Sequence, residues 1–223
     1  MVANKSAATT PPLENGDRLT RYEFERRYAA MPNLKNAELI EGVVYVPAAL
    51  RFKSHGQPHA QIMTWLGVYQ VFTPKVKLGD NPTVRLDLDN APQPDALLII
   101  DGGQAKISAD DYIEGAPELI VEIAASSVAY DLYDKKQAYR RNGIKEYLVW
   151  RVYDQEFDWF YLEKGEYIKL SADQQGVIRS VTFPGLWLNI NALLSGKMEE
   201  VLAILQQGLD SEEHQKFTKY SAE

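Results

Sequence analysis

Two acidic residues stand in segments whose apolar character predicts buried strands. Asp95 precedes the apolar run Ala96–Ile100, and Glu122 lies inside the apolar run 119–123. Runs this apolar are typical of strands that are buried on both faces of a sheet. A carboxylate in such a strand is unfavourable unless a cationic group meets it. We therefore expect a positive partner from a neighbouring element.

The segment that follows the second strand offers two lysines. Residues 131–142 are predicted to be helical because a glycine, a common helix end, comes next. Leu132 and Tyr139 are seven residues apart and mark the inward side of this helix. Lys135 and Lys136 lie between them on the same side, so either lysine could meet the two carboxylates.

Two carboxylates and a lysine around one pocket are suited to phosphodiester hydrolysis. Asp95 and Glu122 could hold Mg²⁺, which binds a few protein oxygens and keeps sites for water and phosphate. Such an ion lowers the pKa of a bound water and stabilises charge that builds on the phosphate. The lysine would orient the nucleophile or offset the developing charge.

Several segments, in a fixed order, carry a resemblance that covers residues 19–194. They are ELIEG at 38–42, His59 at a helix start, QPD at 93–95, EGAPELIVEI at 114–123 and YDLYDKKQAYRRNGIKEYLVW at 130–150. Together they resemble the Uma-type family of restriction-endonuclease-like proteins, within the PD-(D/E)XK nuclease superfamily. The chain departs from the wider superfamily at Ala124, where the lysine usually stands two residues after the glutamate. In the Uma-type pattern the lysine comes from the next helix, and Lys135 is the matching position.

The resemblance implies an α/β (α+β) fold with a restriction-endonuclease-like core, in which helices flank a mixed central β-sheet. It also implies a metal-dependent endonuclease that cleaves nucleic acid, DNA first, with Mg²⁺ or Mn²⁺ on Asp95 and Glu122. We expect a homodimer. The expected catalytic residues are Asp95, Glu122 and Lys135, with Glu38, Glu41 and His59 as further candidates. Glu38 and Glu41 are three residues apart, so on a straight strand only one of them would face the site.

Composition limits the alternatives. The 223 residues are 45% apolar, contain no cysteine and carry a net charge of −7. Disulfides, thiolate zinc sites and thiol nucleophiles are thereby excluded. No apolar run is long enough for a membrane helix or a secretory signal, so we expect a cytoplasmic protein. The acidic balance disfavours strong non-specific DNA binding, although a basic cluster at residues 135–145 could contact phosphates.

The chain divides into a flexible N-terminal tail at 1–17, a nuclease-like domain at 18–195, and a C-terminal helix and tail at 196–223. Residues 37–47 predict a hairpin or a bent strand around Gly42, and residues 75–89 predict a strand pair joined by a turn. Residues 51–57 are expected to be a loop, and residues 107–115 a loop or a one-turn segment. A helix over 193–209 would pack on the core or on a second subunit, with a frayed end after it.

Two other interpretations stay open at this point. The same scaffold could serve as a non-catalytic module that binds a protein or a nucleic acid, because a fold does not fix a function. The charged residues Asp95, Glu122 and Lys135 could also form a purely structural network of ion pairs.

Overall fold

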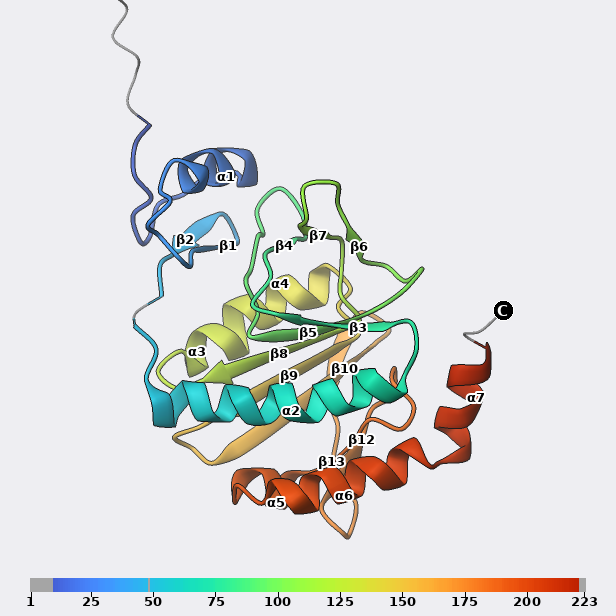
Figure 1. Cartoon of the computed structure of the whole chain (residues 1–223). Coiled ribbons are helices and arrows are strands. Elements are labelled where there is room, and N and C mark those ends of the chain that lie inside the picture. Colours follow the sequence, from blue (N-terminus) through green and yellow to red (C-terminus); the bar gives the residue numbers. More distant parts are fainter. Residues whose placement is uncertain (1–9, 48, 221–223) are drawn as a thin grey trace, which may run out of the picture.

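A mixed sheet with helices on both faces forms the centre of the molecule (Figure 1). The computed structural model describes residues 10–47 and 49–220, and in these residues the central sheet has six strands. Their order across the sheet is β11 (Glu166–Lys169), β10 (Glu156–Glu163), β9 (Glu146–Arg151), β8 (Leu119–Ala124), β5 (Ala96–Ile100) and β3 (Val76–Asp80). Strands β8 and β9 run parallel, and the other neighbours are antiparallel. The predicted mixed sheet is confirmed.

Helices cover both faces of this sheet, which explains the continuous apolar runs of β5 and β8. Helix α2 (Gln57–Phe72) packs on one face through Trp65 and Leu66. The other face is covered by α3 (Val128–Tyr130), η2 (Asp131–Lys135) and α4 (Lys136–Arg141), which follow one another directly. The predicted helix is therefore present, and its η2 portion is a π-helical turn. It links the parallel strands β8 and β9 as a crossover.

The predicted strand pair over residues 75–89 is wrong. Strand β3 pairs with β5 in the central sheet, whereas β4 (Val84–Arg85) pairs with β7 (Ile113–Glu114) in a separate sheet. Asn81 adopts a positive φ of 52°, and Pro82 has no N–H to donate, so the chain leaves the central sheet between them. Strand β7 also pairs with β6 (Lys106–Ile107), so the segment expected as a loop at 107–115 contains short strands.

The N-terminal part forms a small layer of its own. Helix α1 (Arg21–Ala29) packs through Phe24 on the hairpin of β1 (Glu38–Ile40) and β2 (Val43–Tyr45), as the sequence predicted for residues 37–47. Leu13, in the segment expected to be a flexible tail, is buried in the same cluster, while residues 1–9 of that tail lie outside the described residues. The expected loop at 51–57 contains a π-helical turn, η1 (Phe52–Gly56), that leads directly into α2.

The C-terminal part covers the outer side of α2. It comprises β12 (Val177–Arg179), β13 (Trp187–Asn189), α5 (Ile190–Leu194), α6 (Met198–Leu209) and α7 (Glu212–Tyr220). Gly196, at a φ of 71°, separates α5 from α6 within the expected single helix. Val201 and Leu205 of α6 join the core around α2, so this helix packs on its own chain. The expected frayed end is wrong for α7, because His214 is buried and its ring bonds Thr73.

None of the helices in the described ranges is long and apolar enough to span a membrane.

Candidate active site

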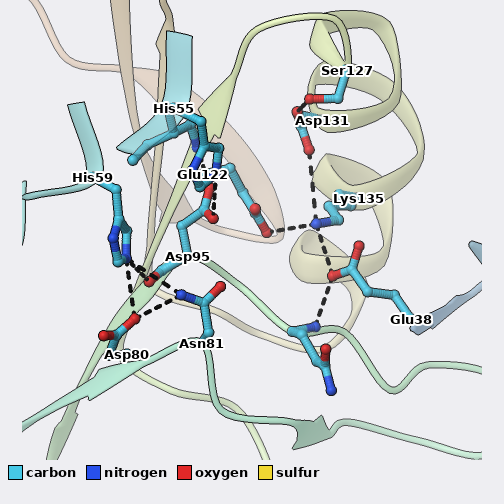
Figure 2. Close-up of polar contacts among 12 residues, drawn as sticks. Glu38, His55, His59, Asp80, Asn81, Asp95, Glu122, Ser127, Asp131 and Lys135 are labelled. Carbon is cyan, nitrogen blue, oxygen red and sulfur yellow. Dashed lines mark hydrogen bonds and ion pairs between the residues drawn. The ribbon is translucent and has the colours of Figure 1, made fainter. Parts of the chain in front are cut away.

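The three residues on which the sequence argument depends line one cavity. Asp95 precedes β5, Glu122 lies in β8 and Lys135 ends η2, and all three border a cavity of about 510 Å³. Figure 2 shows these side chains converging from the sheet and from the helical segment beside it. The structure thus brings together groups that are up to 40 residues apart in the sequence, and their catalytic role stays a prediction.

Lys135 is surrounded by carboxylates. Its Nζ lies 2.9 Å from Glu38 Oε1, 3.0 Å from Glu122 Oε1 and 3.9 Å from Asp131 Oδ1 (Figure 2). Only 4% of the lysine is exposed. Burial by itself would lower the pKa of Lys135, but Glu122, Glu38 and Asp131 outweigh burial and raise that pKa well above its usual value. The ammonium group is therefore charged at every physiological pH.

The structure also decides between the two candidate lysines. Lys136 points elsewhere, because its Nζ lies 3.6 Å from the centre of the Phe160 ring. Burial lowers the pKa of Lys136. Lys135 alone of the two reaches the acidic cavity, as the family resemblance implied.

Glu122 is held by two donors on the same oxygen. Lys135 Nζ and the Tyr139 hydroxyl donate to Glu122 Oε1, at 3.0 and 2.7 Å. Within the described residues no donor reaches the second oxygen, Oε2. Burial raises the pKa of Glu122 well above its usual value; the charge of Lys135 opposes this, and nearby carboxylates add to it. A further positive charge in the cavity would favour its ionised form.

Asp95 is fixed through both of its oxygens. His55 Nε2 lies 2.9 Å from Oδ1, and the backbone N–H of Ile123 donates to Oδ2 at 2.6 Å. The hydrogen bond to Asp95 raises the pKa of His55, although burial opposes it. His55 is not among the predicted site residues because residues 51–57 were expected to be a loop. No local pattern relates this histidine to an aspartate 40 residues away.

Asp131 is a second residue that the sequence argument missed. It is buried in η2, and the Ser127 hydroxyl donates to its Oδ2 at 2.6 Å. Burial raises the pKa of Asp131 from 3.8 to about 6, while Lys135 opposes the shift. A signal was available, since Asp131 precedes Lys135 by four residues and therefore lies on the same side of a helix.

Of the two further candidate glutamates, only Glu38 faces the cavity. Glu38 faces the cavity, where its Oε1 contacts Lys135 and accepts from the Gln93 backbone N–H at 2.7 Å. Glu41 occupies the β1–β2 turn at a φ of 53° and pairs instead with Arg141 outside the cavity. The tight turn around Gly42, rather than a straight strand, directs these two glutamates apart.

His59 lies beside the cavity without lining it. Its Nε2 is 3.0 Å from the backbone oxygen of Asp95 and 3.2 Å from Asp80 Oδ1 (Figure 2). The histidine therefore supports the backbone just before β5, and within the described residues it forms no hydrogen bond or ion pair with the side-chain carboxylates that line the cavity.

The donor set fits a hard divalent cation that keeps most of its water. The part of the chain that the structure describes has no cluster of three or more histidines, cysteines or acids arranged for a metal. Mg²⁺, however, is commonly held by one or two carboxylates together with water and substrate phosphate. Asp95 and Glu122 provide two such carboxylates on adjacent strands, and Glu122 Oε2 is free of protein donors among the described residues.

Comparison with known proteins agrees with this architecture. A search of the solved structures finds a putative nuclease belonging to DUF820 from Anabaena variabilis, with a TM-score of 0.58 and 13% sequence identity; the match covers 76% of this chain and 96% of that one. At this identity the likeness concerns the fold alone. A search of curated proteins finds no match. The sequence profile of the family described as Uma2, "Putative restriction endonuclease", matches residues 21–191. The chain therefore belongs to the Uma2 family.

Proposed function

We propose that this protein is a metal-dependent endonuclease that hydrolyses phosphodiester bonds of nucleic acid, with DNA as the first candidate substrate. The family and the fold indicate a restriction-endonuclease-like nuclease. The metal, the substrate and the residues in their roles are the proposal. The observation that carries it is the imbalance of charge in the cavity.

Four carboxylates line this cavity. They belong to Glu38, Asp95, Glu122 and Asp131. Among the described residues, the basic groups within 4 Å of them are the Lys135 ammonium and the His55 imidazole. Clustered carboxylates disfavour one another's ionised forms unless cations balance them. A phosphate could enter such a site only together with further positive charge, which a divalent cation would provide.

Each residue then has a distinct part. Asp95 and Glu122 would hold the cation, and His55 fixes the orientation of Asp95. A bound divalent cation supplies a water of lowered pKa and a counter-charge for the phosphate. Lys135 directs N–H groups at Glu38 and Glu122 and lines the cavity, so its ammonium can also hold the attacking water or offset charge on the phosphate.

The test combines metal binding with cleavage. We expect purified protein to cut plasmid or single-stranded DNA with Mg²⁺ or Mn²⁺, and titration calorimetry to detect metal binding. Asp95→Asn and Glu122→Gln should abolish both. Glu118→Gln is the matched control, because Glu118 is equally buried just before β8 but bonds the backbone N–H groups of Ile100 and Gln104, outside the cavity.

Circular dichroism would establish that each variant is folded. The proposal fails if the wild-type protein neither cuts nucleic acid nor binds metal in a way that depends on Asp95. Retained cleavage in both Asp95→Asn and Glu122→Gln would also refute it. A partner protein bound equally well by wild type and Glu122→Gln, without any cleavage, would instead favour the binding-module interpretation.

A further inference from the structure

The mouth of the cavity differs in character from its floor. Tyr153, between β9 and β10, and Leu50 both border the cavity and are 63% and 60% exposed. Arg51 borders it as well and is exposed, and no acidic group of the described residues lies within 4 Å of its guanidinium. The mouth therefore offers an aromatic ring, an apolar side chain and a positive charge that has no acidic partner among the described residues.

The floor of the cavity, formed by Asp95 and Glu122, is by contrast enclosed. Asp95 and Glu122 are only 9% and 4% exposed. A cavity of about 510 Å³ falls in the range that accommodates a small organic molecule. A base can stack on an exposed aromatic side chain such as Tyr153 only where its face is free, as in an unpaired strand.

The net charge of the whole chain also favours an unpaired strand over a duplex. Binding to duplex DNA depends mainly on basic side chains that neutralise backbone phosphates. This chain has a net charge of −7. Single strands are also held by stacking of bases on aromatic side chains, and each phosphate contact contributes a smaller salt dependence than on duplex DNA.

We propose that the cavity takes one nucleotide of an unpaired nucleic-acid strand, with a base stacked on Tyr153 and an adjacent phosphate on Arg51. The inference rests on the proposed nuclease function and names its substrate class. The phosphate on the other side of the same nucleotide would then face Asp95 and Glu122. Tyr153 and Arg51 both lie at the mouth. Substitutions there should therefore change binding of the strand without altering the acidic residues of the floor.

Binding can be measured by fluorescence anisotropy with a labelled 12-nucleotide DNA strand, the same strand as RNA, and the corresponding DNA duplex, in Mg²⁺ at low temperature. Gel electrophoresis afterwards confirms that the probes are intact. We expect a single strand to bind at least about 10-fold tighter than the duplex. The DNA and RNA probes decide which unpaired strand is preferred.

Variants of the mouth give the sharper test. Tyr153→Ala should weaken single-strand binding by about 5- to 100-fold, and Tyr153→Trp should retain it. Arg51→Ala should reduce the slope of log affinity against log salt by about 0.7, the value for one phosphate of a single strand. Tyr22→Ala is the control, since Tyr22 is 65% exposed on α1 and does not line the cavity.

Equal or tighter binding of the duplex would overturn the inference, as would equal effects of Tyr153→Ala and Tyr22→Ala. The outcome is distinguishable from failure of the nuclease proposal. Selective binding of a single strand that depends on Tyr153, without any cleavage, would support the inference and refute the nuclease. Cleavage of duplex and single strand at the same rate, unaffected by Tyr153→Ala, would support the nuclease proposal and refute the inference.

Discussion

Replacing Asp131 by asparagine should stabilise the protein at neutral pH. The carboxyl group is 3% exposed, and burial raises its pKa from 3.8 to about 6. Ionising it in the folded state therefore costs about 3 kcal/mol, since each pKa unit corresponds to about 1.4 kcal/mol. Asparagine removes that charge and can still accept from Ser127. Lys135 keeps Glu38 and Glu122 as partners at 2.9 and 3.0 Å.

The gain should depend on pH in a defined direction. Between pH 3.8 and about 6 the folded protein binds more protons at Asp131 than the unfolded chain does. The free energy of unfolding of the wild type therefore falls as pH rises through this window, and the contribution is fully lost above it. The advantage of Asp131→Asn should grow from about 1 kcal/mol at pH 4.5 to about 3 kcal/mol at pH 8.

Urea unfolding followed by tryptophan fluorescence measures this difference, because Trp65 and Trp159 are buried in the core. Asp134→Asn is the matched control, since Asp134 is an exposed carboxylate of the same π-helical turn. It should change the free energy of unfolding by less than about 0.5 kcal/mol. A destabilised Asp131→Asn variant at pH 8, or a gain that does not vary with pH, would refute the reasoning.

Three further substitutions test the remaining interactions. Lys135→Met should lower the free energy of unfolding by about 3–5 kcal/mol at pH 7.5 because it leaves buried carboxylates unbalanced, and adding Glu122→Gln should recover part of that loss in urea titrations. His55→Ala should weaken Mg²⁺ binding about 10-fold or more in calorimetry, because Asp95 Oδ1 loses the donor that orients it, while unfolding changes little. Glu146→Ala should lower thermal stability by about 3 kcal/mol or more, because three donors, including the Trp159 indole, lose their buried acceptor.

The sequence predicted those parts of the fold that depend on local pattern. Apolar runs located β5 and β8, and the glycine at 42 located the hairpin of β1 and β2. The errors concern strands whose pairing partners are distant in the sequence. Alternation over residues 75–89 indicated strands correctly, but periodicity carries no information on pairing, and Pro82 sends the two strands to different sheets.

The residues of the candidate site were likewise predictable only where a local pattern marks them. Asp95 and Glu122 were found because a carboxylate is conspicuous beside or within an apolar strand. Helical spacing reduced the candidates for the positive partner to two lysines. Only the directions of their side chains distinguish them, because Lys135 reaches Glu122 whereas Lys136 lies over the Phe160 ring. His55 was missed because its contact with Asp95 depends on how η1 packs against the sheet, which no short pattern records.

The charges of the cavity connect its stability to its proposed chemistry. Burial raises the pKa values of both Glu122 and Asp131, so the fold itself opposes the ionised form of these two carboxyl groups. A network selected only to hold the fold together would gain from fewer carboxylates around Lys135, as the expected effect of Asp131→Asn indicates. The cation that we propose on Asp95 and Glu122 would offset this cost, because an ion that binds the ionised carboxylates stabilises their charged form.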